Sequence, residues 1–351
     1  MKFRRLIWLS FGMWAIATTV HAQTASAELD VTGGYSGEEI KAAAAQGRVF
    51  GTTGAKTAIQ YFAEAAWGQR WAGEDDGVVG GGLIGADPLG TDVFGAAYPY
   101  KKSVQLVEAY AERYFHGRGA VVGARGGQFR TPFGIYTRSD YGYSGFIRPP
   151  LIRYDGYFAL SNNYLERGAI FTAGIPRLFI EASLGKPHDI GSSHRRGGID
   201  ESVRVQGYYG PLIVGVSHAR SEPYMPAAFA HGRQVFTGAD VRWAHSFGVQ
   251  LRGEFLEGHS FNGVSTTGWY VDAFLHHVGM GPFTVIARDE SLDYTASAPF
   301  ARAARRWTTG TRVRLPGYVT AQINYMHQHG DLPRIYNNSV DFTLTYSLRY
   351  R

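Results

Sequence analysis

The sequence predicts an all-β protein: a transmembrane, up-and-down antiparallel β-barrel of 14 strands, or of 16 if two more lie in the less regular segments. Three observations predict this fold. Long stretches alternate apolar and polar residues one by one. Short turns alternate with longer polar segments along the chain. The chain also begins with an export-type segment, and no later apolar run is long enough to cross a membrane as a helix.

Residues 1–22 have the three parts of a secretory signal peptide. Residues 1–5 are basic, residues 6–20 are largely apolar, and Val20-His21-Ala22 places small or apolar residues just before Gln23. The apolar run has 15 residues, whereas a membrane-spanning helix needs about 20. We therefore expect export and cleavage after residue 22, with an uncleaved anchor as the alternative.

The last segment shows the strand pattern most clearly. Val340, Phe342 and Leu344 alternate with Asp341 and Thr343, and the alternation continues to the end of the chain. Successive side chains of a strand point to opposite faces, so this strand has one apolar and one polar face. Similar patterns predict strands near residues 57–67, 104–115, 119–129, 166–174, 177–185, 202–209, 211–219, 236–244, 247–256, 266–278, 281–289, 304–315, 317–328 and 339–350.

The connections between these strands alternate in length. Short turns are predicted at 116–119, 174–177, 209–211, 245–248, 279–282 and 315–318, with longer segments between them. This alternation is typical of barrels with short periplasmic turns and long outer loops. Residues 23–56 fit least well, and we expect a small periplasmic extension or a run-in to the barrel at 57–351, with a short helix within 37–47. A strand at 28–34 plus one in 67–103 or 130–164 would raise the count to 16.

The composition excludes several other classes of protein. The 46 glycines, 22 tyrosines and 21 phenylalanines suit strands and tight turns rather than a disordered chain. The absence of cysteine excludes disulfides, thiolate metal sites and cysteine nucleophiles. Basic residues are scattered among acidic ones, which argues against nucleic acid as a partner. Trp and Tyr near the predicted strand ends indicate aromatic girdles at the membrane interfaces, formed by Trp67, Trp243, Trp269, Trp307, Tyr325, Tyr346 and Tyr350.

One segment resembles a known family. Residues 127–134 (GQFRTPFG), followed by residues 164–168 (YLERG), resemble the mid-chain segment of the phosphate-selective porin O/P group. The resemblance implies an outer-membrane pore, often trimeric, with a loop that folds inward, and it does not by itself establish phosphate as the solute. The last strand also resembles the terminal assembly signal of outer-membrane proteins. That signal usually ends on an aromatic residue, whereas here Tyr350 is penultimate.

If the apolar face meets lipid, the polar face lines the lumen and carries both signs of charge. Arg312 and Arg314 are two residues apart and share a face, so such arginines could attract anions and orient a phosphate or carboxylate. The alternative is that the lumen arginines pair with lumen acids and only solvate the wall. The predicted inward acids are Glu64, Glu108, Glu112, Glu181, Asp240, Glu254 and Asp272. The predicted inward arginines are Arg204, Arg242, Arg252, Arg288, Arg306, Arg312 and Arg314.

Residues 130–164 form the most informative predicted loop. The segment is aromatic and basic, and Pro149-Pro150 stiffens its middle. Loops of this length are usually functional or disordered. It could fold into the lumen and narrow the channel, or it could pack on neighbouring loops or on another subunit. The candidate constriction residues are Arg130, Arg138, Tyr141, Tyr143, Arg148 and Arg153.

These patterns predict a bacterial outer-membrane channel for passive diffusion of small hydrophilic solutes, with anions as one candidate class. Its expected partners are outer-membrane lipid, the solutes and two further copies in a homotrimer. The alternatives are a hydrolase built on a barrel, or a structural or adhesive barrel with a closed lumen. The chain lacks the G-x-S-x-G and H-E-x-x-H motifs, and we predict no catalytic, cofactor-binding or metal site.

Overall fold

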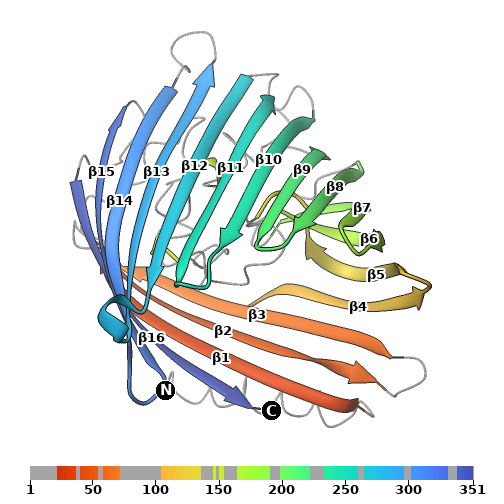
Figure 1. Ribbon diagram of the computed structural model, residues 1–351, viewed down its shortest axis with the longest axis horizontal. Helices are drawn as coiled ribbons and strands as arrows, with labels where there is room; N and C mark the ends of the chain where they lie inside the picture. The colour runs from red at the N-terminus through yellow and green to blue at the C-terminus, as the bar shows by residue number, and fades with distance from the viewer. Residues whose placement is uncertain are drawn as a thin grey trace.

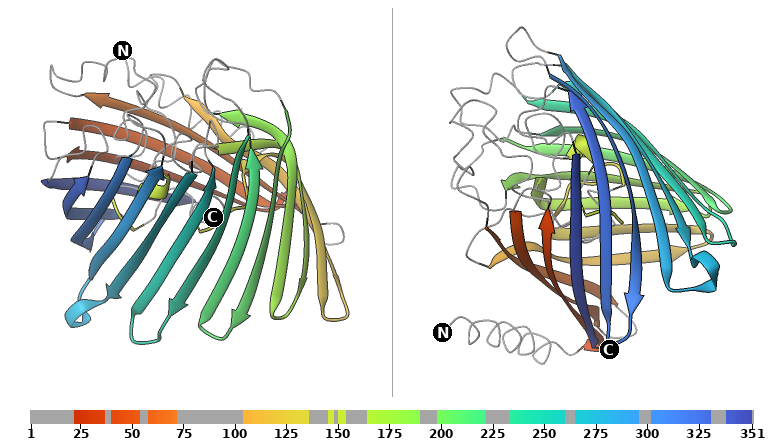
Figure 2. Two further views of the ribbon diagram at one scale, coloured as in Figure 1. Left: turned by 90° about the horizontal axis from the view of Figure 1, so that it is seen from above. Right: turned by 90° about the vertical axis from the view of Figure 1, so that its left-hand side faces the viewer.

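Sixteen antiparallel strands close into one barrel, in which each strand pairs with its neighbours in sequence and β1 pairs with β16 (Figure 1). Figure 2 shows that the strands slant around the wall, as closure of a sheet requires. The computed structural model describes residues 22–36, 40–53, 58–71, 104–135, 145–147, 150–153, 164–189, 198–221, 233–259, 265–295, 302–330 and 338–350.

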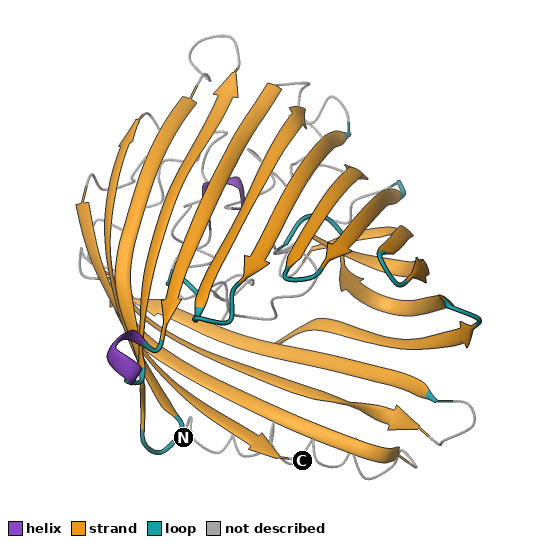
Figure 3. Ribbon diagram, in the orientation of Figure 1, coloured by secondary structure: helices purple, strands orange, loops and turns teal. Residues whose placement is uncertain are grey.

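The strands have the following bounds. The first eight are β1 (Ala22–Ser36), β2 (Ile40–Thr53), β3 (Ile59–Trp71), β4 (Gln105–Gly117), β5 (Ala120–Arg130), β6 (Tyr164–Ile175), β7 (Leu178–Asp189) and β8 (Asp200–Tyr209). The last eight are β9 (Leu212–Ser221), β10 (Gln234–Ala244), β11 (Val249–His259), β12 (Ser265–His276), β13 (Phe283–Thr295), β14 (Arg302–Leu315), β15 (Val319–Gly330) and β16 (Asn338–Tyr350). Two short 3-10 helices are η1 (Leu151–Arg153) and η3 (Val278–Met280), drawn in purple in Figure 3.

The preferred count of 14 strands was wrong and the alternative of 16 is correct, because the N-terminal segment belongs to the wall. β1 contains the alternative strand at 28–34, whereas β2 lies where an extension, a run-in or a short helix was expected. Alanine favours helices, and the run at 42–45 hid the alternation of β2. Pairing with β1 on one side and β3 on the other overrides that local preference. Apart from Ala22, which begins β1, the predicted signal peptide lies outside the described residues.

Short turns join the strands at one end of the barrel, as the sequence predicts. The turns at 118–119, 176–177 and 210–211 each hold two residues between paired strands. Gly119 (φ 74°) and Gly317 (φ 78°) adopt the left-handed conformation that glycine tolerates best. Because the strand number is even, β1 begins and β16 ends at this same edge.

The two faces of the wall have opposite character, and the polar face is the buried one. Along β12, Val271 is 52% exposed while the next residue, Asp272, is fully buried. Along β14, Trp307 is 40% exposed while Arg306 is 1% exposed. A barrel that turns large apolar side chains outward and charged ones inward is typical of membranes rather than of water. Among the described residues, no helix has the length and apolar character needed to span a membrane.

Candidate functional site

The described parts of residues 130–164 lie inside the barrel. Helix η1 packs against β12 and β13, far along the chain from β5, where the segment begins. Three hydrogen bonds join the segment to inward side chains of the wall: Gly134 N–H donates to Ser217 Oγ (3.1 Å), Leu151 N–H donates to Glu290 Oε2 (2.5 Å), and Gln322 Nε2 donates to Gly145 O (3.1 Å). Because these partners belong to β9, β13 and β15, the segment crosses the interior.

Apolar packing holds this internal segment against the wall. The Phe146 ring meets the Phe274 ring edge-on at 5.6 Å, and the Arg288 guanidinium lies 4.0 Å from the centre of the Phe146 ring. The segment's buried apolar residues include Phe133, Ile135, Phe146, Ile147, Leu151 and Ile152. Buried apolar residues of the facing wall include Phe236, Leu256, Tyr270, Phe274, Ile286, Leu292 and Met326. The lumen beside β10–β15 therefore contains a packed core.

Four of the seven predicted lumen arginines are buried in ion pairs beside this core. Asp272 accepts hydrogen bonds from both Arg252 Nε (2.9 Å) and Arg288 Nε (2.5 Å). The other two pairs are Arg204–Asp240 (2.7 Å) and Arg306–Glu290 (2.5 Å). All of these side chains are at most 7% exposed. These four arginines therefore balance wall acids and do not face open water.

The other three predicted arginines lie where the interior is more accessible. Arg242 and Arg312 are half-buried, and Arg314 is exposed. All three lie near the short-turn ends of β10 and β14. Arg314 pairs in register with Thr320, whose neighbour on β16 is Thr345, so a polar strip continues along this wall. This part of the lumen exposes positive charge.

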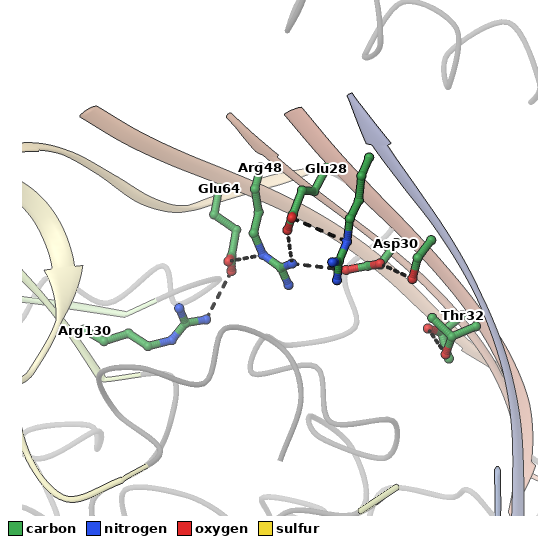
Figure 4. Close-up of polar contacts among 9 residues, drawn as sticks. Glu28, Asp30, Thr32, Arg48, Glu64 and Arg130 are labelled. Atoms are coloured by element: carbon green, nitrogen blue, oxygen red, sulfur yellow. Dashed lines mark hydrogen bonds and ion pairs between the residues drawn. The ribbon is translucent and has the colours of Figure 1, made fainter. Parts of the chain in front are cut away.

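A second charged network lines β1–β5 (Figure 4). Arg48 lies between three carboxylates, at 3.4 Å from Glu28, 3.1 Å from Asp30 and 3.1 Å from Glu64. Arg130, a predicted constriction residue, bonds to Glu64 (3.2 Å) and to Glu108. The side chains of Glu28 and Asp30 are 24% and 26% exposed, whereas those of Arg48, Arg130 and Glu64 are almost covered. Glu28 also lies 3.6 Å from Arg349 of β16, whose side chain is 68% exposed, so this network exposes two carboxylates and one guanidinium.

Sequence reasoning missed Glu28, Asp30 and Arg48 because they belong to the misassigned N-terminal segment. The spacing of Glu28 and Asp30, two residues apart between apolar neighbours, is the signal that could have revealed them. Predicted acids from the rest of the wall lie inside as expected. Glu112 pairs with Arg125 (2.6 Å), whose guanidinium lies 4.0 Å from the centre of the Tyr110 ring. Glu254 accepts a hydrogen bond from Tyr270 (3.1 Å), and Glu181 is buried.

Several predicted constriction residues lie outside the described part of the chain. They are Arg138, Tyr141, Tyr143 and Arg148. Arg153 is described only as the last residue of η1, without its side chain. Within the described ranges, no three His, Asp or Glu side chains are grouped in a way that could hold a metal ion.

The fold resembles solved outer-membrane barrels, although the sequence identity is low. No protein-family model and no curated protein sequence matches the chain. OprB of Pseudomonas putida is 10% identical, with a TM-score of 0.63 and 93% of each chain covered. OmpF of Salmonella typhi is 10% identical, with a TM-score of 0.62 and coverage of 92% of this chain and 97% of that one. An anion-selective porin from Comamonas acidovorans is 13% identical, with a TM-score of 0.59 and coverage of 93% and 99%. The chain therefore has the closed 16-strand barrel fold of bacterial outer-membrane porins.

Proposed function

We propose that this protein is an outer-membrane porin, which forms a water-filled channel for passive diffusion of small hydrophilic solutes. The observation that carries this proposal is the inverted barrel: its outer face is apolar, while solvent reaches charged side chains on its inner face. Asp30 and Arg314 are examples of such lumen charges. A polar inner face that solvent reaches is what a water-filled channel requires.

The solutes we propose include small anions. Arg242, Arg312 and Arg314 are accessible arginines of the lumen, and guanidinium groups bind carboxylates and phosphates through forked hydrogen bonds. The resemblance of residues 127–134 and 164–168 to phosphate-selective porins supports phosphate as one member of this class. The structural similarity to an anion-selective porin from Comamonas acidovorans also supports a preference for anions over cations.

Export and assembly belong to the same proposal. Cleavage after residue 22 would release the mature chain, and N-terminal sequencing of the protein from outer membranes should then begin at Gln23. We also propose a homotrimer, which chemical cross-linking in native membranes should trap as a three-chain species. A detergent-independent soluble monomer would contradict both the localisation and the assembly.

A closed-lumen barrel is the second candidate, because the packed core beside β10–β15 removes part of the cross-section. Single-channel recording in planar bilayers separates the two functions. A porin gives stepwise conductance, and its reversal potential in a KCl gradient gives the ion preference. We expect discrete open channels with a reversal potential on the anion side. Folded protein that never conducts would instead favour the closed barrel.

A further inference from the structure

Two glycines on the inner wall contact the described residues of segment 130–164, which we call the internal loop. Gly238 of β10 and Gly268 of β12 both occupy inward positions, and Leu256 of β11 pairs in register with both of them. The same register row continues to Ser217 on one side and to Leu292 on the other. We call this row the loop seat: Ser217, Gly238, Leu256, Gly268 and Leu292.

Side chains of the loop occupy the space that the two glycines leave open. A Cβ atom added at Gly268 would lie 2.5 Å from Ile152 Cγ2 and 3.0 Å from the Ser291 carbonyl oxygen of β13. One added at Gly238 would lie 2.9 Å from both Phe133 Cζ and the Phe255 carbonyl oxygen of β11. The contact with Ile152 is the shortest of these, so a side chain at Gly268 would displace the loop first. Ile152 and Phe133 are fully buried at these positions. The seat therefore accepts one loop side chain at each glycine.

Polar contacts fix the loop at the same row. Gly134 N–H donates to Ser217 Oγ, which also accepts a hydrogen bond from Arg204 Nη1 (2.9 Å). At the other end, Leu151 N–H donates to Glu290, two residues before Leu292 on β13. These bonds hold the loop backbone on both sides of the apolar contacts. The seat therefore sets the distance between the loop and the inner face of β9–β13.

We propose that the loop seat determines the size limit of the channel. The inference rests on the proposed porin function. Because Gly238 and Gly268 have no side chains, the described residues of the loop lie close to β9–β13. A larger residue at Gly268 would push Ile152 away from this wall and further into the lumen. The wall, and not only the loop, thus sets the diameter that a solute encounters.

The test is the substitution Gly268→Val, measured by single-channel conductance and by uptake of neutral sugars of graded size into proteoliposomes. Valine suits a strand and adds no charge, so the barrel should still assemble. We expect conductance to fall by roughly a third or more, because a narrower pore conducts less. The largest sugar admitted should also become smaller. Conductance and size limit equal to those of the unmodified protein, or increased, would overturn the proposal.

The matched control is Gly126→Val. Gly126 lies on the outer face of β5, and a Cβ atom there would meet nothing within 4 Å. This variant should conduct like the unmodified protein. Resistance of the unheated barrels to unfolding in dodecyl sulfate verifies that both variants fold.

A cross-link tests the seat without relying on a bulky substitution. The chain has no cysteine, so the double variant Ile152→Cys, Gly268→Cys should form one internal disulfide, seen as a mobility shift that a reductant reverses. The pair Ile152→Cys, Gly126→Cys should not form one, because Gly126 faces away from the lumen. Failure of the first pair to cross-link in folded barrels would overturn the seat. A silent but cross-linked channel would refute the porin function and leave the seat intact.

Discussion

The inner wall formed by β8–β14 and the inner wall at β1 both carry charged residues, but the two walls differ in how far solvent reaches those charges. Beside β8–β14, arginines and acids form close pairs beneath the internal loop, and solvent hardly reaches them. On β1, Glu28 and Asp30 are partly open to solvent although they also bind Arg48. Arg314 of β14 is open as well, beyond the covered region. In the proposed channel, an inward charge would therefore act on passing ions only where the loop leaves it uncovered, and the covered charges would serve stability.

The largest expected effect is on the covered wall. The variant Asp272→Ala removes the carboxylate that the buried guanidiniums of Arg252 and Arg288 share. We expect a loss of about 3–5 kcal/mol in the free energy of unfolding. Urea unfolding in lipid bilayers, followed by tryptophan fluorescence, measures it. Stability equal to that of the unmodified barrel would contradict the assignment of these charges to stability.

An intermediate effect is expected from the open arginines. The double variant Arg312→Gln, Arg314→Gln removes two accessible positive charges, so the ratio of anion to cation permeability should fall by about twofold or more at 0.1 M salt. The reversal potential in a KCl gradient measures this ratio. Arg252→Gln is the control on the covered wall, and it should leave the reversal potential unchanged. Equal shifts of the reversal potential in both variants would contradict the distinction between covered and open charges.

The opposite shift is expected from the open carboxylates. Replacing Glu28 by Gln and Asp30 by Asn removes two negative charges at accessible positions and frees Arg48 from two of its three acidic partners. The reversal potential should move towards anions, and the shift should shrink at 1 M salt because the charges are screened. A shift towards cations, or one that salt does not affect, would count against an aqueous path along β1.

The smallest effect is expected on the outer face. Asp289 and Arg305 form an exposed pair at 2.8 Å, with side chains 44% and 56% exposed. The variant Asp289→Asn should leave the free energy of unfolding almost unchanged, because an exposed ion pair contributes little to stability. It should not alter conductance or selectivity, because the pair faces away from the lumen. A changed reversal potential would show that the outward and inward positions of β13 are exchanged.

Much of the wall could be predicted because strands with one apolar and one polar face leave a period-two pattern. β16 and β12 match that pattern closely, and their predicted bounds differ from the observed ones by only one or two residues. β2 could not be predicted in this way, because alanine and glycine give it little contrast between faces. Its strand conformation comes from hydrogen bonds to β1 and β3, which are not visible in local composition.

The candidate site was predictable only in part. The inward positions of Arg204, Arg252 and Arg306 follow from alternation, but their pairing with acids depends on the register between strands. Whether the internal loop covers such a pair depends on the path of the loop, and the spacing of residues in the sequence does not predict that path. Gly268 illustrates the limit, since a glycine within a strand is ambiguous until Ile152 is seen beside it.

The central claim is that alternate residues of each strand meet lipid and lumen water. Single cysteines at 344, 345, 346 and 347 of β16 test it most directly in this cysteine-free chain. Reconstituted in liposomes, cysteines in place of Thr345 and Ser347 should react with a membrane-impermeant, water-soluble thiol reagent. Cysteines in place of Leu344 and Tyr346 should resist it. Equal reactivity at all four positions, or reaction only at 344 and 346, would contradict the account.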